Sequence, residues 1–215
     1  MSRDSRYQLV IFDWDGTLMN SVPKIVACVQ AMATEYQLPV PAETAIRQVI
    51  GYSLDEALYR LFGDAIQGAA LTAGYRRHYL QLDASPSPLF DGVEQLLDTI
   101  NNRGIKMAVA TGKGRDGLDR LLTQTRLTSL FAASRCADET ASKPDPLMLK
   151  QILAELDVPV SSALMVGDAL MDLHMANHLG MDAIGVSYGA FTVPQLRSAS
   201  PKAIIDRPLD LLQFL

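Results

Sequence analysis

The chain has 215 residues, of which 48% are hydrophobic and 20% are charged. This composition is that of a globular protein and excludes a disordered, collagen-like or coiled-coil chain. The formal net charge of −5 argues against a nucleic-acid partner, and no apolar run is long enough for a membrane span. The two cysteines, Cys28 and Cys136, match no metal-binding or redox spacing, so we expect a reduced, cytoplasmic protein.

Strand patterns alternate with helix patterns along most of the chain. A continuous apolar run at residues 8–12 predicts a buried strand of a parallel sheet. Further strands are predicted at 106–110, 131–136, 163–166 and 183–186. Apolar residues with helical spacing lie between them, at 93–102, 118–122 and 147–156. The alternation predicts an α/β fold built on a doubly wound parallel sheet.

Residues 18–84 interrupt this alternation. Helical patterns follow one another there with no strand between them, at 21–36, 43–50, 53–62 and 64–82. A stiff, proline-rich turn at 85–88 then leads back to the sheet. We therefore expect a Rossmann-like core formed by residues 1–17 and 85–215, with an all-helical cap domain inserted at 18–84.

Four acidic residues follow two of the predicted strands. Asp13 and Asp15 are two residues apart, so their side chains can converge at the end of the first strand. The spacing of Asp168 and Asp172 places both on one helix face if a helix begins at Asp168. A turn or a helix cap explains each pair equally well on its own. Ligand sites of open parallel sheets lie beyond the carboxyl ends of the strands, where four carboxylates need a cation such as Mg²⁺.

Two other strand ends carry groups that suit a phosphate. Thr111, Gly112 and Lys113 offer a hydroxyl group and backbone N–H groups where a helix is expected to begin. Lys143 lies in the loop before the helix predicted at 147–156. A lone lysine in a loop is usually solvated, but this one falls on the same edge of the sheet as the acids. We therefore expect an anion to bind beside the metal.

These residues resemble, in chain order, the four motifs of the haloacid dehalogenase-like hydrolases. The motifs are Phe12-Asp13-Trp14-Asp15-Gly16-Thr17-Leu18, Thr111, Lys143 and Gly167-Asp168-x-x-x-Asp172. The resemblance spans nearly the whole chain and is strongest to the phosphoglycolate phosphatase branch, whose small helical cap the insert resembles. It implies a Mg²⁺-dependent phosphatase that hydrolyses a small phosphorylated metabolite through a phosphoaspartate. For the assembly we expect a monomer or weak homodimer.

The resemblance also implies a role for each residue of the motifs. Asp13 would be the nucleophile, Asp15 the general acid and base, and Lys143 would restrain Asp13 and bind phosphoryl oxygens together with Thr111. Counting the four acids and a bound phosphate against Lys143 and the metal favours a proton on Asp15. The metal would be held by Asp13, the carbonyl oxygen of Asp15, Asp168 and Asp172.

The turn at residues 48–52 resembles the specificity loop of the family's cap. We therefore expect Gln48, Gly51 and Tyr52 to contact the substrate, although the turn could equally be a simple connection between two helices. A small cap with few charges favours a compact substrate such as phosphoglycolate or a sugar phosphate. Gly112 stands where the family often has Asn or Ser, which leaves the substrate preference open.

Two classes of protein outside the family fit parts of the sequence. Gly112-x-Gly114-x-x-Gly117 with Asp138 downstream is typical of a dinucleotide-binding oxidoreductase, but that function leaves the four acids unexplained. A phosphoacceptor receiver domain gathers similar residues, but it is smaller and has no cap. His174 and His178 have the spacing of metal ligands, although a polar helix face explains them more simply.

Within the family, a sugar-phosphate mutase or a pyrophosphatase is the alternative to a phosphatase. The family's dehalogenases lack an acid at the position of Asp15, and its mutases use a cap histidine soon after the first motif. Here no histidine precedes His78. The residues therefore favour a phosphatase over a mutase.

Overall fold

The central feature of the structure, a computed structural model that describes residues 6–64, 68–81 and 87–215, is a six-stranded parallel sheet. Its strand order is β3-β2-β1-β4-β5-β6. The strands are β1 (Leu9–Phe12), β2 (Lys106–Thr111), β3 (Ala133–Cys136), β4 (Ala163–Gly167), β5 (Asp182–Val186) and β6 (Ala203–Ile205). The predicted fold class is confirmed, and β6 is a strand that the sequence analysis did not predict.

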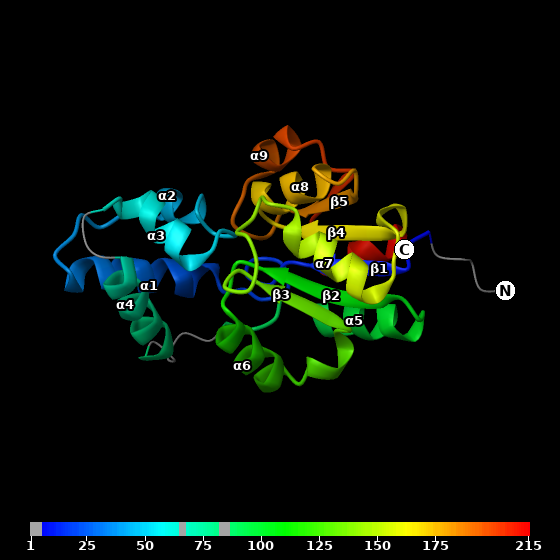
Figure 1. Ribbon diagram of the computed structural model, residues 1–215, viewed down its shortest axis with the longest axis horizontal. Helices are drawn as coiled ribbons and strands as arrows, with labels where there is room; N and C mark the ends of the chain where they lie inside the picture. The colour runs from blue at the N-terminus through cyan, green and yellow to red at the C-terminus, as the bar shows by residue number, and fades with distance from the viewer. Residues whose placement is uncertain (1–5, 65–67, 82–86) are drawn as a thin grey trace.

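Helices cover both faces of this sheet (Figure 1). They are α5 (Val93–Asn102), α6 (Arg115–Thr125), α7 (Leu147–Leu156), α8 (Leu170–Asn177) and α9 (Val193–Ser198). Leu9 and Ile11 of β1 pack in the layer that holds α7, α8 and α9, whereas Val10 and Phe12 pack in the layer of α5 and α6. This division follows from the alternation of side chains along a strand, and it explains why β1 is apolar throughout.

Two helices that begin near the site compare differently with their predicted starts. The helix predicted at 147–156 is observed at these residues, and the N–H group of Leu147 donates to Asp145 Oδ1 at 2.9 Å. The helix expected to begin at Asp168 begins at Leu170, so Asp168 precedes α8 and does not lie on its face. The reason is a local hydrogen bond, because Asp172 Oδ2 accepts from the N–H group of Ala169 at 3.1 Å and caps the helix there.

Four further helices lie between β1 and β2, and we call them, with their connections, the cap. They are α1 (Val22–Glu35), α2 (Glu43–Arg47), α3 (Leu54–Phe62) and α4 (Gly68–Gln81). In Figure 1 the cap lies beyond the carboxyl ends of β1 and β2. No strand interrupts it in the described residues, and α2 is shorter than the helix expected at 43–50.

The cap is joined to the sheet by two chain segments that lie side by side. The N–H group of Asn20 donates to the carbonyl group of Pro88 at 2.8 Å, and that of Phe90 donates to Leu18 at 3.0 Å. Residues 85 and 86 of the turn expected at 85–88 lie outside the described residues, as does residue 84, where the cap is expected to end. Among the helices that the structure describes, none combines the length and the apolar character needed to cross a membrane.

Candidate active site

The carboxyl ends of β1 and β4 meet in the middle of the sheet, where the direction of strand succession reverses. Ligands bind at such a point in open parallel sheets. Phe12 is paired with Val166, and the N–H group of Asp13 donates to the carbonyl group of Val166 at 2.9 Å. This hydrogen bond places Asp13, the first residue after β1, beside the end of β4 that leads to Asp168.

Lys143 joins two of the acids in the interior. Its Nζ atom lies 2.7 Å from Asp13 Oδ1 and 2.6 Å from Asp172 Oδ1, and all three side chains are buried. Burial by itself lowers the pKa of a lysine, but the charges of the two carboxylates outweigh it, and the pKa of Lys143 is raised. Lys143 therefore stays charged, and the sequence-based expectation that it restrains Asp13 agrees with this geometry.

Asp13, Asp168 and Asp172 form a buried group of carboxylates. One oxygen atom of each lies within 4.8 Å of the others. Asp168 accepts hydrogen bonds from Thr17 Oγ1 at 3.2 Å and from the N–H group of Ala190 at 2.6 Å. Asp13 Oδ2 is also buried, but no hydrogen bond reaches it from the described residues. A buried carboxylate oxygen without a donor fits a cation, and three hard oxygen ligands fit Mg²⁺.

Gly16 allows the acids to come this close. Its φ angle is +81°, which L side chains rarely adopt. A Cβ atom at this position would also lie 2.1 Å from Asp168 Oδ2, well inside contact distance. A larger residue after Asp15 would thus displace Asp168 from the carboxylate group.

We expect Mg²⁺ to stabilise the protein more at pH 8 than at pH 5.5. Burial, followed by the charge of Asp172, raises the pKa of Asp168 to about 7 in the metal-free protein. A carboxyl group with a raised pKa contributes stability at low pH that is lost as the pH rises through that value. The metal-free protein should therefore lose stability between pH 5.5 and pH 8, and the bound cation should restore it.

The measurement is the melting temperature with and without Mg²⁺ at both pH values. At about 100 times Kd the ion adds about 2.7 kcal/mol, or roughly 5–10 °C for a chain of this size. A shift of equal size at pH 5.5 and pH 8 would contradict the assignment. Exposed Asp98→Asn serves as the control, since its loss should leave the shift unchanged.

Asp15 stands apart from the buried group, although it is two residues from Asp13. Its Oδ1 atom accepts a hydrogen bond from Ser21 Oγ at 2.6 Å, and its Oδ2 atom lies 3.1 Å from Lys113 Nζ. Burial alone would lower the pKa of Lys113, but Asp15 outweighs it and the pKa is raised. Lys113 is thus a second lysine in the site, which the sequence-based charge count omitted. With it, the four acids exceed the lysines by two charges, which one Mg²⁺ would balance.

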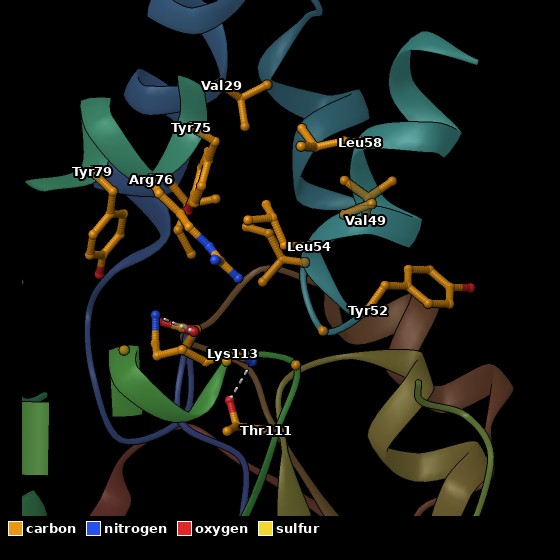
Figure 2. A pocket seen from close by; sticks show the side chains of 18 of the residues that line it. Val29, Val49, Tyr52, Leu54, Leu58, Tyr75, Arg76, Tyr79, Thr111 and Lys113 are labelled. Atoms are coloured by element: carbon orange, nitrogen blue, oxygen red, sulfur yellow. Dashed lines mark hydrogen bonds and ion pairs between the residues drawn. The ribbon is translucent and has the colours of Figure 1, made fainter. Parts of the chain in front are cut away.

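A cavity of about 410 Å³ separates the cap from these residues. Asp13, Asp15, Thr111 and Lys113 are on its sheet side, with Lys113 donating its backbone N–H to Thr111 Oγ1 at 3.2 Å (Figure 2). The cap side is largely apolar. Residues expected in one site thus form two layers, since Lys143, Asp168 and Asp172 lie buried beneath the cavity.

The turn at residues 48–52 contacts the segment at residues 111–113 through its backbone. A Cβ atom on Gly112 would lie 2.3 Å from the carbonyl oxygen of Tyr52 and 2.6 Å from that of Gly51. Only glycine at position 112 allows this approach, which accounts for the departure from the family's Asn or Ser. The N–H group of Ser53 also donates to Ser142 Oγ at 2.9 Å, so the cap rests on the sheet here.

The three residues predicted to contact the substrate from the turn at residues 48–52 differ in where they lie. Gly51 and Tyr52 line the cavity, but Gln48 is exposed and is not among its lining residues. The Tyr52 ring points away from the cavity centre in Figure 2, with the Arg60 guanidinium 4.2 Å from its centroid. The helix α2 ends at Arg47, and Gln48 follows it as an exposed residue of the turn. A contact of the Gln48 side chain with the substrate therefore stays a prediction without support from the cavity lining.

Sequence reasoning missed the aromatic and basic residues that α4 contributes. Tyr75, Arg76 and Tyr79 line the cavity, and Lys113 Nζ lies 4.9 Å from the centroid of Tyr79. The spacing of four between Tyr75 and Tyr79, continued from buried Leu71, puts the two tyrosines on one helix face, which is the signal that the sequence offers for them.

The residues that suggested a dinucleotide site have another use. Asp138 Oδ1 lies 3.0 Å from the N–H group of Arg115 and caps α6, so a carboxylate already occupies this helix N-terminus. His174 and His178 are exposed, and His178 Nδ1 lies 3.1 Å from the carbonyl oxygen of Pro144. Among the described residues the three buried acids are the group that could hold a metal.

Residues 10–186 match the family of haloacid dehalogenase-like hydrolases, and the chain belongs to that family. The family predicted from the four motifs is thus confirmed. The chain is 34% identical to a probable phosphatase, IndB, of Dickeya dadantii over 92% of this chain and 89% of that protein. It is 25% identical to a phosphoglycolate phosphatase of Nitrosococcus oceani over 97% of this chain and 96% of that protein. It is 30% identical to an N-acetylmuramic acid 6-phosphate phosphatase of Pseudomonas putida over 98% of this chain and 96% of that protein. A solved hydrolase of Pseudomonas syringae superposes with a TM-score of 0.86 at 27% identity, over 96% of each chain.

Proposed function

We propose that this protein is a Mg²⁺-dependent phosphatase that hydrolyses a small phosphomonoester through a phosphoaspartate on Asp13. The observation that carries the proposal is the Asp13 carboxylate itself. One of its oxygen atoms is held by Lys143 at 2.7 Å, and the other is buried without a hydrogen bond from the described residues. Asp13 also lines the cavity, so a substrate bound there would lie next to the fixed carboxylate.

The chemistry is divided between the two layers of the site. Asp13 attacks phosphorus, and the hydrolysis becomes two displacements in place of one. Lys143 keeps the attacking carboxylate in one orientation from beneath, and Thr111, which lines the cavity, faces the phosphoryl oxygens. When bound to Asp13, Asp168, Asp172 and the Asp15 carbonyl oxygen, Mg²⁺ would neutralise the transferring group.

Asp15 is the group placed to move protons. It donates a proton to the leaving oxygen in the first displacement and accepts one from water in the second. Ser21 and Lys113 hold its two oxygen atoms, at 2.6 Å and 3.1 Å. It lies on the cavity side, where a leaving group and the incoming water both pass.

The position of His78 favours a phosphatase over a mutase. His78 Nε2 lies 2.6 Å from Glu35 Oε2 in the cap, and the residue does not line the cavity. His78, the histidine of the cap sequence, is thus paired with Glu35 and does not face the cavity. A pyrophosphatase would use the same four acids, so the choice between a phosphatase and a pyrophosphatase depends on which substrate is hydrolysed.

The decisive experiment is a phosphatase screen over small phosphorylated metabolites, including phosphoglycolate, sugar phosphates and pyrophosphate, with and without Mg²⁺. We expect release of phosphate from monoesters only when Mg²⁺ is present. Release from pyrophosphate alone would replace the proposal with a pyrophosphatase. No release from any compound would reject it.

We expect Asp15→Asn to slow the hydrolysis of alkyl phosphates by about 10²- to 10⁴-fold, because a poor leaving group needs the proton of the general acid. Nitrophenyl phosphate leaves without one, so its first displacement should be much less affected. Slow attack by water should then produce a burst of nitrophenolate and a phosphorylated enzyme. Stopped-flow absorbance measures the nitrophenolate burst, and the intact-protein mass shows the phosphorylated enzyme. Equal losses for both esters would contradict the acid role.

A further inference from the structure

The cavity is larger and more apolar than a two-carbon phosphate needs. Its volume of about 410 Å³ falls within the roughly 300–1,000 Å³ of sites that enclose drug-sized ligands. On the cap side it is lined by aliphatic residues, which include Val29, Val49, Leu54 and Leu58 (Figure 2). They come from three different helices or turns of the cap, so the apolar surface surrounds the space and is not a single stripe.

One charged residue interrupts this apolar surface. Arg76 is the charged side chain among the described cap residues that line the cavity, and Figure 2 shows it extending from α4 between Leu54 and Lys113. A Cβ atom on Gly114 would lie 3.8 Å from Arg76 Nη2, so the guanidinium reaches across to the loop of the sheet. No hydrogen bond or ion pair holds Arg76 in the part of the chain that the structure describes.

The neighbouring charges show why Arg76 remains available. Lys113 is paired with Asp15 at 3.1 Å, and Asp138 accepts from the N–H group of Arg115. Asp116 also lines the cavity, but no ion pair joins it to Arg76. An arginine without a partner is suited to bind a carboxylate through two parallel hydrogen bonds.

We propose that the leaving group of the substrate combines a hydrocarbon body, which fills the apolar part of the cavity, with a second anionic group bound by Arg76. The proposal rests on the phosphatase function proposed above and narrows its substrate class. The phosphoryl group occupies the sheet side beside Asp13 and Thr111, and the body extends toward Leu54 and Val49. This proposed substrate is larger than the compact substrate that the sequence favours.

Two matched series of esters test the two halves of this proposal. The first consists of linear carboxylic acids of two to eight carbons with a phosphate on the terminal carbon, beginning with phosphoglycolate. The second consists of the corresponding primary amides, which have the same shape without the charge. We expect kcat/KM to rise by roughly three- to fourfold for each added methylene until the cavity is full. We also expect each long acid to exceed its amide by about tenfold or more.

Substitutions test whether Arg76 causes the preference for the acid and whether the apolar cap residues cause the preference for longer chains. Arg76→Met should bring the acid-to-amide ratio close to one, whereas Arg77→Met should keep it, because Arg77 lies next along α4 and pairs with Glu35. Leu54→Asn should flatten the dependence on chain length. Circular dichroism and melting temperature check the fold of each variant.

Several results would overturn the proposal. Highest activity with phosphoglycolate would show that the substrate needs no hydrocarbon body. An unchanged acid-to-amide ratio in Arg76→Met would show that Arg76 does not bind the second anionic group. In both cases release of phosphate from the esters themselves by the unaltered protein shows that the phosphatase function stands. No release of phosphate from any ester of either series, nor from acetyl phosphate, would reject both proposals.

Discussion

We expect Asp13→Asn to lower kcat by roughly 10⁴- to 10⁶-fold, the scale of loss when an enzyme is deprived of its nucleophile. The amide keeps the shape of the carboxylate but cannot attack phosphorus. The fold should survive, because Lys143 keeps the Asp172 carboxylate as a partner at 2.6 Å. The neutral amide also avoids the cost of burying a charge, which raises the pKa of Asp13 well above the ordinary value.

The test measures kcat with p-nitrophenyl phosphate and the melting temperature of both proteins. The unaltered enzyme should form a phosphorylated species that hydroxylamine releases, and Asp13→Asn should form none. Asp98→Asn, an exposed substitution in α5, controls for the loss of a carboxylate elsewhere. Activity within tenfold of the unaltered enzyme would end the assignment of Asp13 as nucleophile.

The sequence predicts the sheet and the sites at its edge because both depend on local patterns. A buried parallel strand such as β1 must be apolar on both faces, so its end, and therefore Asp13, is visible in the sequence. The four motif positions follow strands or loops at one edge, where the sheet topology brings them together. Neighbouring strands in register leave little freedom there.

The cap could be predicted as a helical insert, but its contribution to the site could not. Which face of α4 meets the cavity depends on how four amphipathic helices pack against one another, and no single pattern fixes that. Arg76 is therefore indistinguishable in the sequence from Arg77, which pairs with Glu35 on the outside. The exposure of Gln48 in the turn after α2 depends on the same packing.

The side-chain contacts of the predicted site residues could not be predicted from the sequence either. Lys113 was assigned to phosphate binding, yet its ammonium group pairs with Asp15 and lies against Tyr79 of the cap. This contact joins a residue of the sheet edge to one of the cap across a long stretch of chain. The side-chain contacts of long, flexible residues depend on such distant neighbours.

We expect Lys143→Met to destabilise the metal-free protein by about 3–5 kcal/mol at pH 8, the usual cost of leaving a buried charge without its partner. The Met side chain fills a similar volume, so the loss is electrostatic. Asp13 and Asp172 lose the ammonium group that lies 2.7 and 2.6 Å from them, and Asp168 is close to both. At roughly 2–4 °C per kcal/mol, the melting temperature should fall by about 10 °C.

The dependence of this loss on pH and Mg²⁺ separates it from a packing defect. Without Lys143 the buried carboxylates must be protonated to fold, so the loss should be large at pH 8 and shrink toward pH 5. Mg²⁺ should raise the melting temperature of Lys143→Met more than that of the unaltered protein, because no lysine then competes with the cation for Asp13 and Asp172. Exposed Lys150→Met, in α7, should change stability by no more than about 0.5 kcal/mol. If Lys143→Met melts as far below the unaltered protein at pH 5 as at pH 8, the lysine acts through packing and the buried carboxylates do not depend on its charge.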